Sequence, residues 1–397
     1  MEAGLPLHST VDLEESCARM ARLFPSLIAP LLLVPALFGC SGGNSAPTIP
    51  PVSAEALKTV AKDPGANRDE LARAIDSLFH DEAAGETRAL IVMHDGRIVA
   101  ERYAPGYHEN TRFVSWSMAK SVTGVMIGML VSDGRLRLAE SAPIPAWQRP
   151  GDPRGEITLK QLLQMRSGLR HVENGDPIYK SDEVRMLFLD GRDDMARYAE
   201  DQPLQHEPGT KWVYSTATSV ILADLAARSL SQAPDPDSRR RAVADYLRTR
   251  LFEPAGMKSM IPEFDAAGTL IGGSLIHGNA RDWAKFGEFL RNKGAVKGAQ
   301  IIPRQWIEFM TTPSPREAQY GAQIWLNRKP TSGEPSLFPD RGPADLFACE
   351  GHLGQYVLVS PSLHLVVVRL GHTPAAQAGH LVSKLADVVQ LYRPGNR

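Results

Sequence analysis

Cysteine and clustered charge are both scarce in this chain. Only three of its 397 residues are cysteine, which is too few for a disulfide framework. The formal net charge is −1 and no long basic run occurs, so we expect no nucleic-acid partner. The 11 histidines are scattered, without a His-Glu-x-x-His sequence or a close Cys/His cluster, so we expect no metal ion and no other cofactor.

The chain contains enough apolar residues to form a substantial hydrophobic core. Hydrophobic residues make up 43% and charged residues 22%, a balance that suits one large globular domain or two closely packed ones. Near the N-terminus, a charge-free stretch at 23–39 follows Arg22 and ends in Leu-Phe-Gly-Cys40. A short positive region, an apolar segment and a small residue before the cleavage point are typical of a secretory signal.

The end of that segment resembles the signal of bacterial lipoproteins. The resemblance implies that Cys40 is lipidated and anchors the protein to a membrane in the periplasm of the bacterial cell envelope, with the outer membrane as the expected site. Residues 1–19 are acidic, which does not suit a signal, so we expect translation to start at Met20 rather than Met1. The alternative is a transmembrane anchor, but about 17 residues broken by prolines are a poor span.

Three regions follow from this interpretation. Residues 1–39 are an N-terminal extension with a lipoprotein-type signal, and residues 40–56, rich in Gly, Ser and Pro, are a flexible tether. Residues 57–397 form the folded domain. Within it, two β-rich runs in 88–103 flank Asp95-Gly96, a strong hairpin signal.

Hydrophobic patterning places strands at both ends of the domain and helices between them. Residues 350–369 are predicted to form two strands around a Pro-Ser turn, and 219–230 and 378–392 are predicted helices. We therefore expect an antiparallel sheet built from both chain ends and flanked by helices, with a mainly helical insertion at about 140–268. This is an α/β (α+β) architecture.

The most informative stretch is Ser-Trp-Ser117-Met-Ala-Lys120-Ser, which opens an apolar run at 122–131. The run predicts a buried helix with Ser117 in its first turn and Lys120 on the same face. A lysine desolvated by apolar neighbours can take the proton of a serine hydroxyl and so activate it as a nucleophile. The alternative is a capped core helix that carries an exposed lysine.

Two later motifs complete an ordered set, Tyr214-Ser215-Thr216 and His352-Leu353-Gly354. With Ser117-x-x-Lys120, they resemble the motifs of the serine β-lactamase and penicillin-binding-protein family. The chain is closest in style to class C β-lactamases, DD-peptidases, related esterases and 6-aminohexanoate-dimer hydrolases. Connecting phrases at 157–169, 207–215 and 272–287 agree, and the resemblance covers about 84–392. It implies a β-lactamase/transpeptidase-like fold.

The resemblance also implies roles for individual residues. Ser117 would be acylated, Lys120 would act as base or proton relay, and Tyr214 would pass the serine proton to the leaving group. Tyrosine titrates near 10 in model peptides, so we expect the Lys120 charge to lower the pKa of Tyr214. The oxyanion would lie between the N–H groups of Ser117 and Gln355, with Gly354 allowing close approach of the strand.

The chain departs from the family pattern at two positions. Thr216 stands where lactamases commonly have Asn. His352 stands where they have the lysine whose positive charge binds the β-lactam carboxylate. We therefore expect a serine hydrolase that forms an acyl-enzyme on small amide or ester substrates, with its oligomeric state left open. His352 could donate a hydrogen bond or carry charge at mildly acid pH, and Tyr179 is a candidate for lining the cleft.

Two alternatives remain open at this point. One is a true class C-type β-lactamase or DD-peptidase. The other is a non-catalytic protein that uses this fold to bind cell wall or peptide.

Overall fold

The computed structural model describes residues 52–394. Cys40, Met1, Met20 and most of the predicted tether therefore lie outside the described residues. Within residues 52–394, the largest sheet has six strands in the order β2-β1-β11-β10-β9-β8, and every neighbouring pair is antiparallel. Its strands are β1 (Glu86–His94), β2 (Arg97–Tyr103), β8 (Trp325–Leu326), β9 (Phe347–Gly351), β10 (Gln355–Ser360) and β11 (Leu365–His372).

The sheet joins the two ends of the folded domain, as the hydrophobic pattern predicts. β1 pairs with β11, which places His94 opposite Leu365. The β1–β2 hairpin turns at Asp95-Gly96, whose φ angles are 50° and 73°. Positive φ at both central residues is what a two-residue hairpin turn requires, and Asp-Gly supplies it at low cost.

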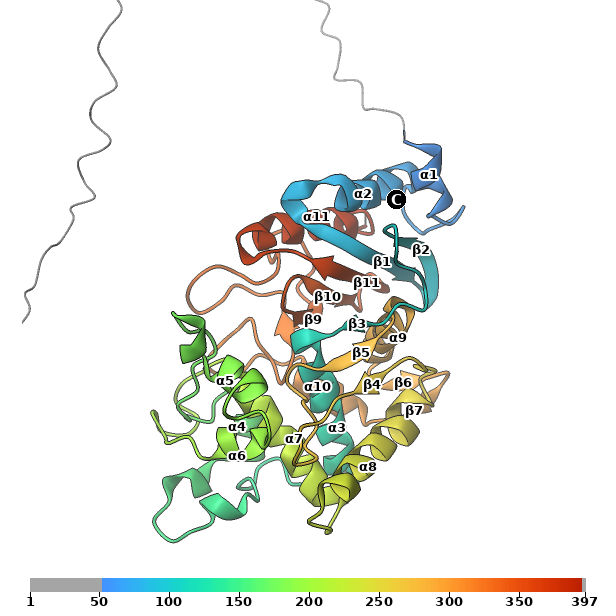
Figure 1. The fold of residues 1–397 in the computed structure, drawn as a ribbon. Coiled ribbons are helices and arrows are strands. Elements are labelled where there is room, and N and C mark those ends of the chain that lie inside the picture. The colour runs from blue at the N-terminus through green and yellow to red at the C-terminus, as the bar shows by residue number, and fades with distance from the viewer. Residues whose placement is uncertain (1–51, 395–397) are drawn as a thin grey trace, which may run out of the picture. The chain divides into compact units, whose positions relative to one another are not determined.

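Helices cover both faces of the sheet (Figure 1). α2 (Arg68–His80) and α11 (Ala378–Gln390) lie on one face and α9 (Ala280–Arg291) on the other. Alternate residues of β1 serve the two layers: Leu90 and Val92 pack with α2 and α11, whereas Ile91 and Met93 belong to the core on the α9 side. Because both faces of the sheet are buried, the sequences of these strands are almost continuously apolar.

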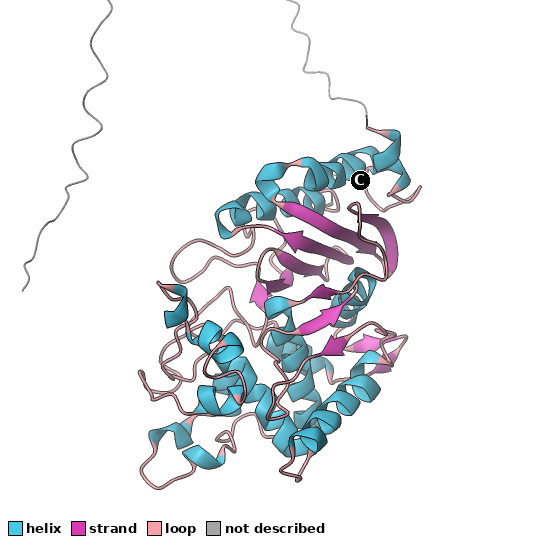
Figure 2. Ribbon diagram, viewed as in Figure 1, coloured by secondary structure: helices cyan, strands magenta, loops and turns pink. Residues whose placement is uncertain are grey.

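In the rest of the described chain, helices joined by long loops predominate over strands (Figure 2). Residues 140–268 hold α4 to α8 and the short strand β4 (Ile261–Pro262). The α-helices of the described chain not yet given a range, inside and outside 140–268, are α1 (Ala54–Lys58), α3 (Ala119–Ser132), α4 (Leu159–Leu163), α5 (Asp182–Phe188), α6 (Met195–Glu200), α7 (Thr216–Leu230), α8 (Pro236–Leu247) and α10 (Arg304–Met310). The remaining strands are β3 (Phe113–Val114), β5 (Ile276–Gly278), β6 (Ala295–Val296) and β7 (Ala299–Gln300).

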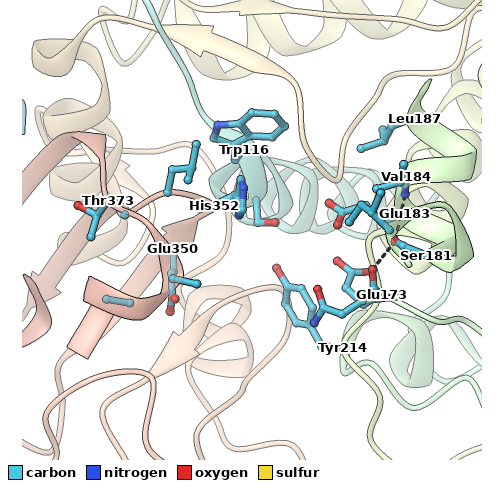
Figure 3. A pocket seen from close by; sticks show the side chains of 18 of the residues that line it. Trp116, Glu173, Ser181, Glu183, Val184, Leu187, Tyr214, Glu350, His352 and Thr373 are labelled. Atoms are coloured by element: carbon cyan, nitrogen blue, oxygen red, sulfur yellow. Dashed lines mark hydrogen bonds between the residues drawn. The ribbon is translucent and has the colours of Figure 1, made fainter. Parts of the chain in front are cut away.

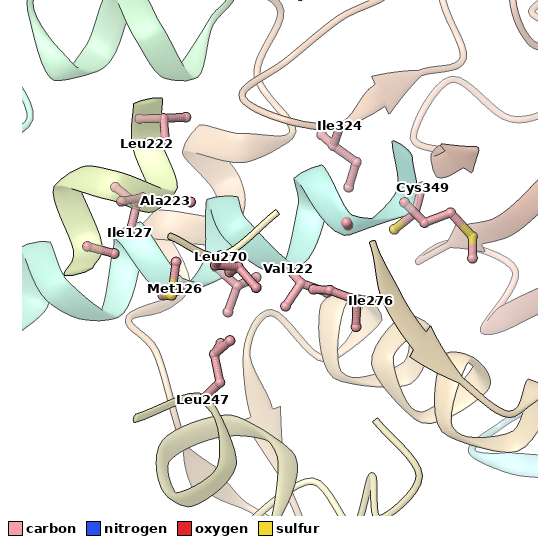
Figure 4. Packing of buried hydrophobic residues seen from close by; sticks show 14 of the residues in the cluster. Val122, Met126, Ile127, Leu222, Ala223, Leu247, Leu270, Ile276, Ile324 and Cys349 are labelled. Atoms are coloured by element: carbon pink, nitrogen blue, oxygen red, sulfur yellow. The ribbon is translucent and has the colours of Figure 1, made fainter. Parts of the chain in front are cut away.

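α3 runs through the centre of this core (Figure 4). Its residues are buried from Ala119 to Leu130, so the helix shows no polar face. Gly128 lets Trp306 approach: a Cβ there would lie 2.2 Å from the indole nitrogen. That nitrogen donates to the carbonyl of Gly124 over 3.0 Å. The helix that follows Ser117 is therefore held rigidly on all sides.

Three elements differ from the sequence predictions. α1 lies at the end of the predicted tether. α7 begins at Thr216, not at 219, because the Ser215 side chain caps it by accepting from the N–H of Thr218. Residues 350–369 hold a turn in addition to two strands, because Leu353 and Gly354 have φ of 60° and 79° and end β9 before β10 begins. His352 therefore lies in the turn between β9 and β10.

Candidate active site

Ser117 lines a cleft between the β9 end of the sheet and the α5 region. Figure 3 shows Glu350 and His352 on one side of this cleft and Glu183 and Leu187 on the other. The cleft holds about 470 Å³, a size suited to a small molecule. Ile178, Val184, Leu187 and Phe188 make one wall apolar. Lining residues that carry acidic side chains are Glu173, Glu183 and Glu350, and within residues 52–394 no lysine or arginine lines it.

The nucleophile candidate lies in a strained turn. Ser117 is in the short 3₁₀ helix Trp116–Met118 that precedes α3. Trp116 has φ of 45°, which is rare for a bulky residue and costs about 1–3 kcal/mol. Ser115 anchors the turn, since its side chain accepts from the N–H of Ile276 over 3.1 Å and its own N–H donates to the carbonyl of Ile276 over 3.0 Å. These two hydrogen bonds to β5 thus hold the strained Trp116 turn in place.

Lys120 is brought to Ser117 as the spacing predicts. Its Nζ lies 2.9 Å from Ser117 Oγ, 2.8 Å from Thr216 Oγ1 and 2.9 Å from the carbonyl oxygen of Gly273. The side chain is 2% exposed, and burial lowers the pKa of its amine, opposed by the charges of Glu173 and Glu183. The alternative interpretation, a capped core helix with an exposed lysine, is therefore wrong.

The hydrogen-bond partners indicate where the lone pair of a neutral Lys120 points. The Gly273 carbonyl can only accept, so it takes one N–H of the amine. Thr216 gives its own proton to Glu173 Oε1 over 2.5 Å, so its oxygen accepts a second N–H of the amine. A neutral amine has two N–H bonds and one lone pair. The lone pair is left for the hydroxyl of Ser117.

Glu173 is a site residue that the sequence analysis missed. Its Oε2 accepts from the backbone N–H of Thr216 over 2.7 Å, while Oε1 accepts from the Thr216 hydroxyl. Burial raises the pKa of Glu173, and the charge of Lys120 opposes that rise. Its position in a polar loop with no motif gave no signal, and only the fold carries it to Thr216.

Tyr214 reaches the same corner from the residue before the α7 cap. A hydrogen bond with Ser117 acts to lower the pKa of its phenol. The ring is stacked on Trp325 at 5.4 Å between centroids and meets Tyr320 edge-on at 5.8 Å. Lys120 Nζ lies over this ring, 4.8 Å from its centroid.

The expected lowering of the Tyr214 pKa by Lys120 is contradicted. Burial, with the nearby Tyr320 and Glu173, raises the pKa of Tyr214 well above 10. The phenol is therefore neutral in the resting site and can donate a proton but not begin as a phenolate. The lysine amine, whose pKa is lowered, is the better base of the two.

The third motif approaches the nucleophile through a different glycine from the one predicted. A Cβ on Gly351, at the end of β9, would lie 2.3 Å from the carbonyl oxygen of Ser115. Gly354 instead packs its α-carbon toward Arg369 and Leu381, and Arg369 donates to its carbonyl over 2.9 Å. Close approach of the strand to the serine segment therefore depends on Gly351, and Gly354 serves the turn.

Gln355 is not brought to Ser117. It is 3% exposed, pairs with Gly351 across β9 and β10, and is absent from the cleft lining. Its side chain binds the backbone of Gly371, donating over 2.7 Å and accepting over 3.0 Å. In the described part of the chain, no backbone carbonyl accepts from the N–H of Ser117 or of His352.

The other predicted residues are placed as follows. Tyr179 is 60% exposed and does not line the cleft, whereas its neighbour Ile178 does. His352 lines the cleft with its ring edge-on to Trp116 at 5.4 Å. Burial lowers the pKa of His352, as does the nearby His372, so it favours the neutral imidazole. Across residues 52–394, no group of three His, Cys, Asp or Glu side chains is arranged to hold a metal ion.

His171 positions the start of α7. Its Nδ1 lies 2.8 Å from Ser215 Oγ and its Nε2 lies 3.1 Å from the carbonyl of Ala199, so the buried ring is neutral, with Nε2 carrying the proton. Burial lowers its pKa from 6.5 to about 4.

We expect His171 to make folding stability depend on pH. Between pH 6.5 and 4 the unfolded chain binds a proton that the folded chain excludes, so stability falls as pH falls through this window, by about 3 kcal/mol in total. Urea unfolding of wild type and His171→Gln at pH 7 and pH 4.5 measures it. The variant should lose less stability on acidification than wild type or the control His364→Gln, at an exposed histidine. Equal losses would contradict the prediction.

No helix within residues 52–394 has both the length and the apolar content to cross a lipid bilayer.

Known proteins resemble this chain over nearly its whole described length. The sequence profile of the Beta-lactamase family matches residues 75–386. A 6-aminohexanoate-dimer hydrolase from Paenarthrobacter ureafaciens is 22% identical over 337 residues, which cover 80% of this chain and 81% of that protein.

Solved structures agree on the fold. A Bacillus anthracis protein provisionally named 6-aminohexanoate-dimer hydrolase matches with a TM-score of 0.62 at 22% identity, over 79% of this chain and 81% of that one. A penicillin-binding protein homologue from Caulobacter crescentus matches with a TM-score of 0.55 at 16% identity, over 83% and 98%. The expected β-lactamase/transpeptidase-like fold is confirmed. The profile match shows that the chain belongs to the Beta-lactamase family, and it is a serine hydrolase of that family.

Proposed function

We propose that Ser117, Lys120 and Tyr214 are the catalytic residues of an amide or ester hydrolase. The observation that carries this proposal is the meeting of amine 120, hydroxyl 117 and phenol 214 in one corner of the cleft. Lys120 accepts the proton of Ser117 as the Ser117 oxygen attacks the substrate carbonyl. Tyr214 then delivers a proton to the leaving group.

The tetrahedral intermediate needs donors for its oxyanion. We assign them to the N–H groups of Ser117 and His352 and not, as the family resemblance implies, to that of Gln355. The close approach of Gly351 to Ser115 supports this, because it sets the following residue beside the nucleophile. Two unpaired N–H groups at that point are the usual means of stabilising such a charge.

We propose that the substrates are amides or esters without a carboxylate beside the scissile bond. Glu173, Glu183 and Glu350 line the cleft and no lysine or arginine of the described chain does. A carboxylate of the β-lactam kind would meet like charge there. The Paenarthrobacter relative is named for the hydrolysis of a 6-aminohexanoate dimer, not of a β-lactam, in keeping with this preference. For the β-lactamase and DD-peptidase alternatives, the described part of the cleft has no lysine or arginine to pair with such a carboxylate.

A comparison of two chromogenic substrates tests this preference. We expect kcat/KM for nitrocefin, which carries a carboxylate, to be about 10²-fold below that for an uncharged p-nitrophenyl ester, a difference of about 2.7 kcal/mol in transition-state binding. Burial raises the pKa of Glu350 to about 7, so Glu350→Gln should raise nitrocefin turnover relative to the ester, more at pH 8 than at pH 6. A nitrocefin rate above the ester rate in wild type would contradict the proposal.

We also propose that the mature protein is lipidated at Cys40 and held at the periplasmic face of a bacterial envelope membrane. The support is the Leu-Phe-Gly-Cys ending and the Gly/Ser/Pro stretch that follows it. Intact mass of the natural protein should show a chain that begins at Cys40 and carries added lipid. The control Cys40→Ala should stay in the aqueous phase of a detergent partition. A mature chain that keeps residues before Cys40 would contradict the proposal.

A further inference from the structure

Behind Lys120 lies a hydrogen-bonded chain that the proposed mechanism does not yet use. Lys120 Nζ donates to Thr216 Oγ1 over 2.8 Å, and Thr216 Oγ1 donates to Glu173 Oε1 over 2.5 Å. Thr216 is fully buried. The carboxylate is fixed from both sides, because its other oxygen accepts from the N–H of Thr216 over 2.7 Å. The three groups form one continuous path from the nucleophile's base to an acid.

We propose that Thr216 and Glu173 form a proton relay that returns Lys120 to its neutral form once it has taken the Ser117 proton, and that gives the stored proton back in the second half of the reaction. This rests on the proposed roles of Ser117 and Lys120. When Lys120 has taken the Ser117 proton, an Nζ–H proton moves to Thr216 Oγ1. At the same time the Thr216 hydroxyl proton moves to Glu173 Oε1. Lys120 ends neutral, Thr216 is unchanged, and Glu173 ends as a carboxylic acid.

The relay gives the second half of the reaction a free base. Attack of water on the acyl-enzyme needs a neutral amine or another base beside the ester, and an ammonium at Lys120 cannot serve. With the proton stored on Glu173, Lys120 can accept a proton from the attacking water. Lys120 then passes the water proton to Ser117 Oγ as the acid product leaves, and the proton on Glu173 returns through Thr216, Lys120 and Ser117 to the Tyr214 phenolate, which had given its own proton to the leaving group. No proton is gained or lost over the cycle beyond hydrolysis itself.

Threonine at this position is essential to the path. A hydroxyl accepts a proton and donates one through the same atom, so it can pass a proton on. Asparagine, which the family commonly has here, accepts through its oxygen and donates through its nitrogen. It can hold Lys120 in place but cannot pass the proton without changing its bonding. The departure at Thr216 and the presence of Glu173 therefore belong together.

The charges around the relay favour movement in both directions. Burial raises the pKa of Glu173, and the charge of Glu183 raises it further, while Lys120 lowers it. Burial lowers the pKa of Lys120. Glu183 Oε1 lies 3.4 Å from Thr216 Oγ1, and Tyr214, Tyr320 and Glu350 face the same corner. Acid and amine thus approach each other in proton affinity, which a reversible transfer requires.

Four variants of the full-length protein test the relay on a p-nitrophenyl ester. Thr216→Val and Glu173→Gln should each lower kcat by about 10²-fold, the usual contribution of a positioned proton-transfer group. Thr216→Ser should keep most of the activity because it keeps the hydroxyl. The double variant should lose little more than either single one, because both cut the same path. Circular dichroism and Tm of each variant establish that it is folded.

A proton inventory separates transfer from positioning. In mixtures of H₂O and D₂O, kcat of the wild type should fall along a curve, as expected when two or more protons move together. Thr216→Val and Thr216→Asn should give a straight line. Glu183→Gln is the matched charge control: Glu183 raises the pKa of Lys120 as Glu173 does, so both substitutions should shift the acid limb of kcat/KM to lower pH. Only Glu173→Gln should remove the curvature.

The opposite results would overturn the relay. Full activity in folded Thr216→Val, additive losses in the double variant, or a wild-type inventory that is already linear would each contradict it. Loss of activity in Ser117→Ala alongside such results would leave the proposed function standing. A Ser117→Ala variant that stays active would instead refute the proposed function.

Discussion

The variant Ser117→Ala is expected to lose hydrolysis by about 10⁶-fold, the loss seen when a serine hydrolase is deprived of its nucleophile. Lys120 Nζ lies 2.9 Å from this hydroxyl, and the strained Trp116 turn presents it to the cleft. Without the hydroxyl no acyl-enzyme can form, although the substrate should still bind. Hydrolysis of a p-nitrophenyl ester and covalent labelling by a fluorophosphonate measure the effect.

Ser121 provides the matched control for this experiment. It lies one turn further along α3 and donates to the carbonyl of Gln323 over 2.8 Å, away from the cleft. Ser121→Ala should keep the fluorophosphonate label, and Ser117→Ala should lose it. Failure of the wild-type protein to take up the label would favour the binding-protein alternative. A label on Ser117→Ala would place the nucleophile elsewhere.

Lys120→Met should lower kcat/KM by about 10³–10⁴-fold, because the serine loses its general base. Methionine fills a similar volume, so the packing of α3 is largely kept. Thr216 Oγ1 and the Gly273 carbonyl lose a donor, at about 1–3 kcal/mol for each unsatisfied group, but a desolvated amine is removed as well. We therefore expect a folded protein with altered Tm and almost no activity.

The pH profile gives this prediction a second readout. The base must be neutral, so kcat/KM of the wild type should rise with pH through the lowered pKa of Lys120 and then level off. In Lys120→Met the residual activity should lack that rise. Lys285→Met is the control, since this lysine pairs with Asp282 on α9, outside the cleft. An unchanged rise in Lys120→Met would assign the base to another group.

Much of the site could be predicted because its residues lie in short motifs. Ser117 and Lys120 are one helical turn apart, so local geometry alone joins them. Tyr214 and His352 were found through the order of the family motifs, and the cleft includes both. The hairpin at Asp95-Gly96 is predictable for the same reason, since a few neighbouring residues decide it.

Other features depend on contacts between distant segments. The expected role of Gly354 failed because a glycine pattern does not tell a close approach from a turn, and here Gly351 makes the approach. The expected effect of Lys120 on Tyr214 failed because Lys120 lies over the ring, and the aromatic side chains that bury the phenol come from residues more than 100 positions away.

The sequence by itself determined the family, a sheet built from segments near both ends of the domain and the serine–lysine pair. These depend on hydrophobic period, turn residues and spacings within one helix, which act over a few residues. Only the tertiary structure decided which glycine meets the nucleophile, that the cleft is acidic, and that Glu173 stands behind Thr216 and Lys120. The burial and charge at one point in space depend on every segment that packs there. The order of those segments along the chain does not show that they are in contact.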